Sequence, residues 1–245
     1  DDSCIWCGDG CAEPAEGVDY TLTVEASTPV AAFGTTYRFY VNMQDPTDKF
    51  SAVYGNNQTP LIINTPDGAF NSGFNTSWSA SGIGAAFLGF FPEMADDTYA
   101  TIGLDGTATS SGIVGAMDPA MVQEEEDVIT PYFTTDGATS LTSVGSSWYV
   151  LTTAANGLPN DDMRVLVLQV TTTGDISGTI NYHVYPFGDG TIDKVSVSLD
   201  FNGAGTYGGI YGTSNACGCM DDTATNYDED ADYDNGSCEY EEILG

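Results

Sequence analysis

The chain has very few positive charges. Lys and Arg together number 4 in 245 residues, against 36 Asp and Glu, so the formal net charge at pH 7 is −32. Nucleic-acid phosphates and anionic membrane surfaces repel a chain of this charge, so we expect no nucleic-acid partner. Most carboxylates also lack a basic partner, and we expect solvent or cations to neutralise them. The charge balance therefore favours a role for cations.

Long hydrophobic runs are missing as well. The longest apolar-looking run, Ile83–Phe91, is shorter than the about 20 residues of a membrane-spanning helix, and Gly84 and Gly89 interrupt it. We therefore expect no membrane insertion. The chain opens with Asp1 and Asp2 without a visible leader, which favours the mature form of a secreted protein.

Enzyme signatures are scarce. His183 is the only histidine, and a Ser-His-acid triad would have to use it. It alternates with apolar residues on a predicted strand, which favours a surface or edge position. No phosphate-binding or dinucleotide-binding motif occurs, and among 36 acids no glycosidase pair stands out. We expect a protein that is not an enzyme.

Cysteine is absent from residues 12–216, and all six cysteines lie near the two ends of the chain. They are Cys4, Cys7, Cys11, Cys217, Cys219 and Cys238. An even number in two clusters favours disulfides in an oxidising, extracellular or cell-surface compartment. The alternative is a zinc site on the first three, but its fourth ligand would have to be His183 or Cys217.

The long middle of the chain is typical of β-structure. Apolar and polar residues alternate, or apolar residues run together, in the segments 19–26, 35–43, 147–151, 164–170, 176–185 and 194–201. Weaker strand candidates are 50–54, 61–63 and 99–104. About nine strands with Gly, Asp and Pro turns predict an all-β fold, a β-sandwich or jelly-roll-like body. Trp148, inside an apolar run, is expected in its core.

One helix is predicted. Asp118 is a suitable N-cap and Pro119 suits the first helical position, so we expect two helical turns over Ala120–Asp127. The rest of the stretch 105–145 is rich in small residues and is expected to be mostly loop.

Composition divides the chain into three parts. We predict a Cys-rich N-terminal segment over residues 1–17, the β-sandwich domain over 18–213, and an Asp-rich, Cys-framed module over 214–245. Ten of residues 221–245 are acidic and none is basic. A segment of this composition is either a solvated acidic tail or a cation-binding module.

The acidic module favours calcium. Its oxygen ligands are expected to be Asp221, Asn226, Asp228, Asp230, Asp232 and Asp234. Ca²⁺ takes about 6–8 oxygen ligands, and the last four acids alternate along the chain, so a loop can turn them toward one ion. The spacing is not that of an EF-hand, because Gly236 stands at the seventh position counted from Asp230 and not at the sixth.

A disulfide between Cys219 and Cys238 would close this module. Such a loop is worth about 3 kcal/mol in the chain-entropy model. Cys217 is too near Cys219 to pair with it readily, so Cys217 would then pair with a cysteine of the N-terminal cluster. That bond would tie the two chain ends together or link neighbouring subunits.

The segment Cys219–Tyr240 resembles a short repeat of the form G-C-x-D-x-x-A-x-N-Y-(D/N)-x-x-A-x-x-D-(D/N)-G-S-C-x-Y. The matching positions are Gly218, Cys219, Asp221, Ala224, Asn226, Tyr227, Ala231, Asp234, Gly236, Ser237, Cys238 and Tyr240. The repeat occurs in large secreted and surface proteins of marine bacteria, Bacteroidetes especially. Residues 36–42, 101–106, 147–151 and 169–174 also resemble a domain of such proteins. The resemblance implies an extracellular, surface-associated protein and implies no activity.

Two functional hypotheses follow. The first is a structural protein that self-associates into a homo-oligomer or filament, as the subunit of a secreted filament, sheath or surface assembly stabilised by disulfides and calcium. The alternative is an adhesin or carbohydrate-binding module whose exposed aromatic residues are Phe74, Trp78 and Phe87. Three triplets predict N-glycosylation, at Asn57, Asn75 and Asn235.

Overall fold

The chain forms two compact units in a computed structural model. One unit is Tyr20–Tyr207, and the other combines Asp1–Asp19 with Gly208–Gly245. The structure describes residues 20–123, 126–188, 190, 194–208, 216–218, 221–225, 227, 231–234 and 238–240. The predicted β-sandwich domain, 18–213, begins two residues before the first unit and ends six residues after it. Each unit is described by itself.

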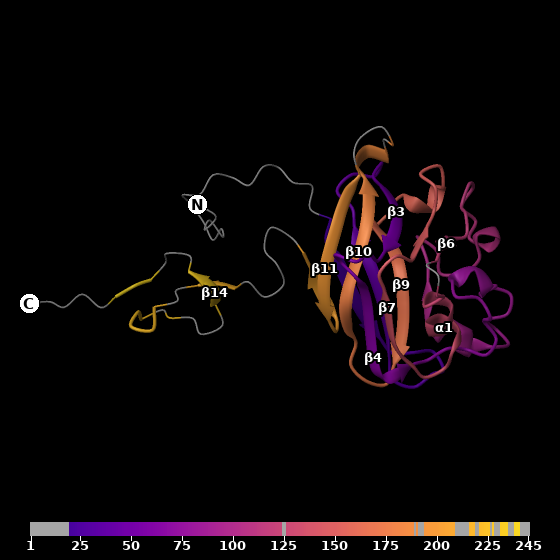
Figure 1. The fold of residues 1–245 in the computed structure, drawn as a ribbon, viewed down its shortest axis with the longest axis horizontal. Coiled ribbons are helices and arrows are strands. Elements are labelled where there is room, and N and C mark those ends of the chain that lie inside the picture. Colours follow the sequence, from indigo (N-terminus) through magenta and orange to yellow (C-terminus); the bar gives the residue numbers. More distant parts are fainter. Residues whose placement is uncertain are drawn as a thin grey trace, which may run out of the picture. The chain divides into compact units, whose positions relative to one another are not determined.

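The larger unit is built from strands (Figure 1). Its strands are β1 (Leu22–Ser27), β2 (Thr35–Asn42), β3 (Lys49–Tyr54), β4 (Leu61–Ala69), β5 (Tyr99–Ala100), β6 (Ala120–Val122), β7 (Ala138–Ser143), β8 (Ser147–Tyr149), β9 (Arg164–Thr172), β10 (Ser177–Tyr185), β11 (Val195–Asn202) and β12 (Gly205–Tyr207). The helical elements are α1 (Ile129–Thr134) and the single 3₁₀ turns η1 (Ala80–Gly82), η2 (Pro92–Asp96), η3 (Ala108–Ser110), η4 (Ala155–Gly157) and η5 (Pro186–Gly188). In the smaller unit β13 (Ala216–Gly218) pairs in parallel with β14 (Ala231–Asp234). No helix among the described residues has the length and apolar character needed to cross a membrane.

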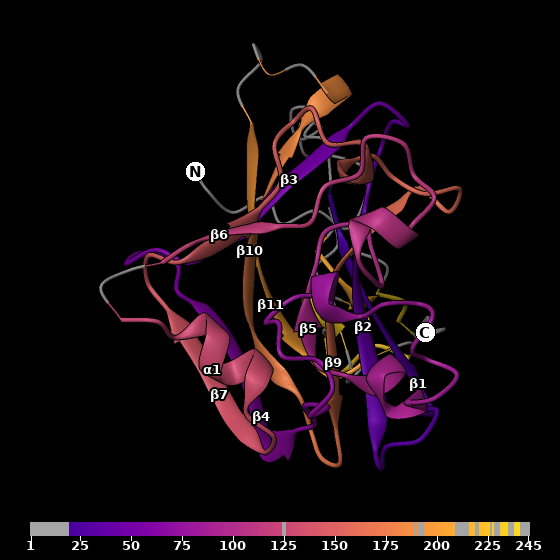
Figure 2. The ribbon, with the colours of Figure 1, turned by 90° about the vertical axis from the view of Figure 1, so that its right-hand side faces the viewer.

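The twelve strands of the larger unit form one antiparallel sheet, so the predicted all-β class is confirmed. Its order is β12-β1-β2-β9-β4-β10-β3-β8-β6, with β11 paired to β10, β5 to β9 and β7 to β4. Only one residue pair, Ala69 with Thr172, joins β4 to β9. The sheet therefore has two halves that meet at this narrow connection (Figure 2).

The two halves enclose one hydrophobic core, which makes the architecture sandwich-like. Phe39 of β2 and Phe201 of β11 come from different halves, and their rings meet edge to face with centroids 5.0 Å apart. The hydroxyl of Tyr182 on β10 donates to the backbone carbonyl of Tyr20, which precedes β1. Trp148 is fully buried in the same core, as predicted. Period-two alternation supplies this core because alternate side chains face the same side of a strand.

Strand β9 is buried along nearly its whole length. Its apolar residues belong to the core, whereas Gln169 and Thr171 contact the long segment that links β4 to β6. That segment pairs with β9 at Tyr99 and Ala100 and covers it. The near-continuous apolar run predicted a strand with two covered faces, and β9 has this environment.

The predicted helix over Ala120–Asp127 is wrong. Residues 120–122 form strand β6 against β8, and Asp118 accepts the backbone N–H of Ala108, the first residue of η3, at 2.8 Å. The helix begins later, at Ile129, because Ile129, Tyr132 and Phe133 provide an apolar i, i+3, i+4 face, which the Glu124–Glu126 run of the predicted helix lacks. Pro131 fits because the first-turn N–H groups have no partner within the helix.

The stretch expected to be mostly loop also contains strand β7. Leu141 and Ser143 are its only buried side chains, so its sequence shows little apolar alternation. Its pairing with β4 decides the structure here. The candidate strand 99–104 shortens to Tyr99–Ala100 because the chain then bends through Gly103, whose φ is +65°.

We expect Phe201→Ala to destabilise the larger unit by about 3–5 kcal/mol, because the ring is buried against Phe39 and Tyr207. Urea unfolding followed by tryptophan fluorescence measures the change in free energy of unfolding. Phe90→Ala is the matched control: its ring is 80% exposed, and we expect a change within about 0.5 kcal/mol. Equal losses in the two variants would contradict the cross-core packing.

Candidate functional site

The segment 70–98 forms an outer layer over β9, and Gln169 of β9 anchors it. The Gln169 amide nitrogen donates to the carbonyls of Ala95 (2.9 Å) and Asp97 (2.8 Å). Its oxygen accepts from Arg38 Nε (2.7 Å) and from the Tyr99 hydroxyl (3.2 Å). All four hydrogen-bonding positions of this buried amide are satisfied, so the segment is held in one position.

Asp96, also in this segment, holds the loop between β1 and β2. Its carboxylate is 2% exposed and accepts the backbone N–H groups of Val30 (2.6 Å), Ala31 (2.7 Å) and Ala32 (2.8 Å). Three oriented amides compensate a buried negative charge without any basic side chain. The three hydrogen bonds fix the backbone just before Phe33, whose side chain is 87% exposed.

Asp97 anchors the beginning of the same segment. One carboxylate oxygen accepts the Ser72 N–H at 2.6 Å, and the other accepts the Asn75 amide at 2.6 Å. Burial raises the pKa of Asp97 from 3.8 to about 7, and the hydrogen bonds from Ser72 and Asn75 oppose that rise only in part. The carboxyl of Asp97 is therefore mostly protonated in the folded state below about pH 7.

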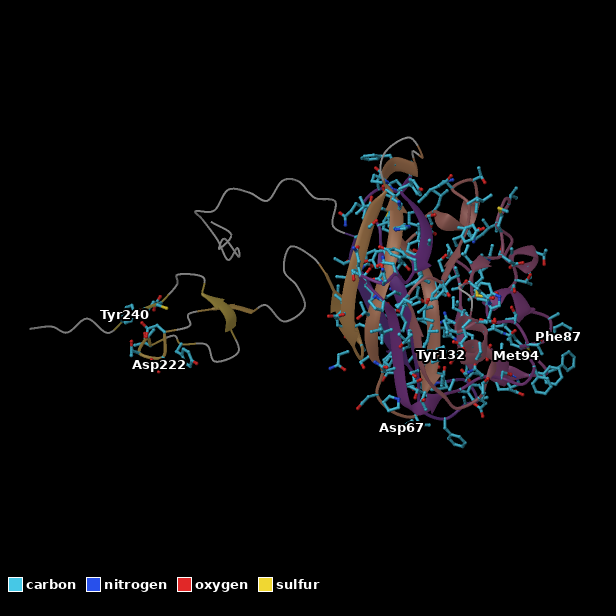
Figure 3. All side chains as sticks on the ribbon, viewed as in Figure 1. Asp67, Phe87, Met94, Tyr132, Asp222 and Tyr240 are labelled. Carbon is cyan, nitrogen blue, oxygen red and sulfur yellow. The ribbon has the colours of Figure 1, made fainter. Side chains whose placement is uncertain are left out.

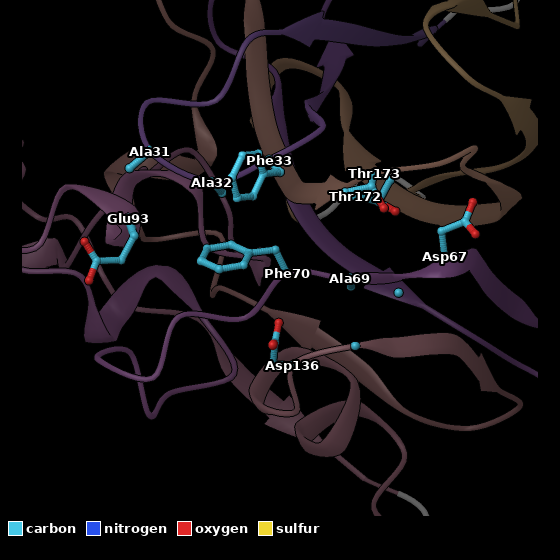
Figure 4. A pocket seen from close by; sticks show the side chains of 12 residues that line it. Ala31, Ala32, Phe33, Asp67, Ala69, Phe70, Glu93, Asp136, Thr172 and Thr173 are labelled. Carbon is cyan, nitrogen blue, oxygen red and sulfur yellow. The ribbon is translucent and has the colours of Figure 1, made fainter.

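These anchors position a groove of about 430 Å³ in the larger unit (Figure 4). The rings of Phe33 and Phe70 lie next to each other, beside Ala31. The carboxylates of Asp67, Glu93 and Asp136 lie around them. We call this feature the Phe33 groove. It can take an apolar group on its rings and a cation or hydroxyl groups at its acidic rim.

A second exposed feature lies on the segment 70–98. Phe74, Phe87 and Phe90 are 52–80% exposed and form what we call the loop aromatics. Phe74 stacks on half-buried Phe91 with ring centroids 4.0 Å apart. Figure 3 shows Phe87 on the outer side of this layer, beyond Met94.

The predicted binding aromatics are thus only partly brought to the surface. Phe74 and Phe87 are exposed, whereas Trp78 is half-buried and packs against the core. Phe33, Phe70 and Phe90 were not among the predicted aromatic residues. For Phe33, the sequence signal of an exposed turn was the glycine that follows it, Gly34. Gly34 has φ +100°, and a Cβ there would lie 2.1 Å from the Thr172 carbonyl oxygen, so the turn requires glycine.

The predicted calcium ligands are described only in part. Asn226, Asp228 and Asp230 lie outside the described residues, and Asp232 and Asp234 lie on β14. Asp221 is half-buried. It accepts from Thr223 N–H (2.9 Å), Thr223 Oγ1 (2.6 Å) and the Tyr240 hydroxyl (2.7 Å), and the Thr223 hydroxyl is the main cause of its lowered pKa. Within the described part of the chain no three acidic, His or Cys residues cluster as metal ligands. Calcium binding by this module stays a prediction.

Contacts within the module bring its two ends together. Both the N–H and the hydroxyl of Thr225 donate to the Glu239 carbonyl, at 2.8 and 3.0 Å, and Tyr240 reaches Asp221. Cys238 is disulfide-bonded, but its partner's side chain is not among those described. Cys4, Cys7, Cys11 and Cys219 lie outside the described residues, and Cys217 is described only as part of β13. The predicted pairing of the cysteines therefore stays open.

Two of the three predicted glycosylation sites can be located. Asn57 is exposed, and Asn235 lies outside the described residues. Asn75 is 4% exposed, and its amide nitrogen donates to Asp97 and to the Ser79 carbonyl (3.3 Å). A glycan on that nitrogen would require this loop to open.

His183 lies on β10, an interior strand, and not at a sheet edge. Its ring stacks on Tyr54 with centroids 4.1 Å apart. Burial, with a smaller contribution from Lys194, lowers its pKa to about 4. A histidine in this environment stays neutral at physiological pH.

Searches with family models, among curated proteins and among solved structures find no match to this chain.

We expect Asp97 to lower the stability of the larger unit as pH rises from about 4 to 8, against the opposite contribution of His183 between about pH 4 and 6.5. The folded pKa of Asp97 is raised, so its favourable contribution is complete below the unfolded pKa and is lost as pH passes about 7. A rise of about three units corresponds to at most about 4 kcal/mol. Asp97→Asn should remove this loss from the profile of unfolding free energy against pH, measured by urea unfolding in high salt.

The matched control is Asp161→Asn, which removes the same charge from an exposed position. It should keep the parent profile. If Asp97→Asn and Asp161→Asn give the same slope between pH 5 and 8, the buried carboxylate does not set the pH dependence.

Proposed function

We propose that this protein is a non-enzymatic structural subunit of a secreted or cell-surface assembly. One observation carries the proposal: an acidic domain that exposes large apolar side chains. Phe33, Phe87 and Phe90 are more than half exposed, although the chain carries a net charge of −32. Exposed aromatic surface of this kind is typical of protein–protein contacts, in which aromatic side chains supply most of the affinity.

The charge determines how copies of the chain come together. Like charges repel, so two copies associate only where the charge is neutralised. Divalent cations bound by the carboxylates of the acidic module would supply that neutralisation, and disulfides at the chain ends would stabilise the product. The resemblance of Cys219–Tyr240 to repeats of marine bacterial surface proteins supports the extracellular location.

The assembly proposal predicts calcium dependence. In about millimolar calcium, the range of extracellular calcium modules, the full chain should form oligomers or filaments visible by electron microscopy, and a chelator should disperse them. Asp230→Asn with Asp232→Asn should weaken assembly because two predicted ligands are lost. Asp161→Asn with Asp162→Asn, which removes two exposed charges from the larger unit, should not. A chain that stays monomeric at every calcium concentration would overturn the proposal.

An adhesin or carbohydrate-binding role is the second candidate, and the exposure of Phe74 and Phe87 supports it. Aromatic faces stack on sugar rings. Binding on a glycan array, lost in Phe74→Ala with Phe87→Ala and kept in Val114→Ala, would favour this role. Val114 is 96% exposed and lacks a ring, so it controls for apolar surface alone. Binding that survives the double substitution would rule out these two rings as the site.

A further inference from the structure

Strand β11 is a long strand at the margin of the sheet (Figure 1). All eight of its residues pair with β10, without a shift in register. Among the described residues no strand pairs with its other edge. The strands at the two ends of the sheet order, β6 and β12, have only three residues each, and short edge strands limit pairing with another chain. Strand β11 is therefore the longest edge in the described part of the sheet.

Hydrogen bonds at the end of β11 show which backbone groups point away from β10. The Asn202 N–H donates to the Tyr207 hydroxyl (3.0 Å), and that hydroxyl donates to the Asn202 carbonyl (2.7 Å), so neither group faces β10. The N–H of Gly203 donates to the Ile176 carbonyl at 2.8 Å, on the β10 side. Successive residues of an antiparallel strand direct these groups to opposite sides, so every second residue shares the outward orientation of Asn202. These residues are Ser196, Ser198 and Asp200.

The side chains of β11 divide between core and solvent. Val195, Val197 and Leu199 are half-buried and pack against the core, whereas the residues between them are exposed. The strand contains no proline, lysine or bulge, which are the common devices that hinder pairing at a sheet edge. A second strand laid along this edge would continue the sheet and pack beside the half-buried valines and leucine.

The sequence along this edge is self-complementary about Val197. When two copies pair antiparallel with Val197 opposite Val197, Val195 lies opposite Leu199 of the second copy. In the same register Lys194 lies opposite Asp200, and opposite charges directly across a strand pair are favourable. Ser196 lies opposite Ser198, and both direct their backbone N–H and carbonyl groups outward, so the two copies can exchange hydrogen bonds there.

The charges at this edge allow two acidic copies to approach. Residues 194–200 carry one lysine and one aspartate, in a chain of net charge −32. Both side chains are exposed, and Lys194 forms no ion pair with a described residue. The Asp200 carboxylate accepts the Thr179 hydroxyl at 2.6 Å and has no basic partner among the described residues. Asp193, which precedes Lys194, lies outside the described residues. The other acids of the chain repel over a longer range, which salt screens.

We propose that two copies of this chain pair edge to edge through β11, antiparallel and about a two-fold axis at Val197. This inference rests on the proposed self-association and names one surface that makes it. The contact is isologous, so it closes a dimer and does not by itself extend into a filament. Calcium-dependent contacts of the acidic module would then join such dimers into the larger assembly.

A charge exchange tests the pairing and its register in the full chain. In about 0.5 M salt with a chelator, repulsion is screened over a few ångström and the parent chain should form dimers without calcium. Lys194→Asp sets two acids opposite each other, and Asp200→Lys sets two lysines opposite each other. Each variant alone should dimerise at least about fivefold more weakly than the parent chain in sedimentation velocity. An equimolar mixture of the two variants should regain the parent affinity, because an acid again faces a lysine.

Asp161→Lys is the matched control, since it makes the same change of charge at an exposed position outside β11. It should dimerise like the parent chain. If it weakens the dimer as much as Asp200→Lys does, or if the mixture is no better than the single variants, the inference fails. A parent chain that stays monomeric in this buffer and yet assembles in calcium would overturn the inference and leave the proposed function standing. A parent chain that never associates overturns both.

Hydrogen exchange gives a second measurement on the parent chain. The outward amides of Ser196 and Ser198 should exchange rapidly in the monomer and at least about tenfold more slowly in the dimer, because pairing would protect them. Full protection in the monomer would contradict the proposal, since another part of the same chain would then occupy the edge. Urea unfolding of each variant establishes that none has lost its fold.

Discussion

The outer layer of the larger unit depends on one buried amide. Gln169 projects from β9 and satisfies four partners, two of them carbonyls of the segment 70–98. Replacing a buried amide leaves those carbonyls without donors, and that loss is costly away from water. Because these hydrogen bonds hold the segment 70–98 in place, Asp96 and Asp97 lie within hydrogen-bonding distance of their own partners. Both the loop aromatics and the Phe33 groove are therefore positioned by a residue that belongs to neither.

Scarce positive charge is the second constraint on this chain. Of the four basic residues, Arg38 donates a hydrogen bond to the Gln169 side-chain oxygen. Arg164 forms an ion pair with Glu25 and lies 4.0 Å from the Tyr40 ring centroid. Lys49 donates to the Thr152 carbonyl, and the remaining basic residue, Lys194, is exposed. The fold consequently uses backbone amides to hold its buried acids, Asp48 and Asp96. Neutralisation of the remaining acids falls to solvent and cations, which is why the proposed assembly depends on calcium.

Alternation predicted the strands whose side chains divide between core and solvent. The segments 35–43 and 176–185 lie close to β2 and β10, because each supplies apolar residues to one face. Strand β7 was not predicted because it has a single buried apolar residue, Leu141, and therefore shows no apolar–polar alternation. The helix lies later than predicted because residues 129–133 carry an apolar face that packs on the core, whereas the cap signal at Asp118 is only local. Tertiary pairing overrides such local signals.

The sequence alone determined the charge, the all-β class, the clustering of cysteines at the chain ends and the acidic module with its predicted calcium ligands. These follow from composition and short-range pattern, which need no partner elsewhere in the chain. Only the tertiary structure decided that Phe33 and Phe70 form a groove, and that β11 pairs with β10 alone among the described strands. The physical reason is that antiparallel pairing joins residues distant in sequence, such as Ala69 and Thr172, and no local pattern records that register.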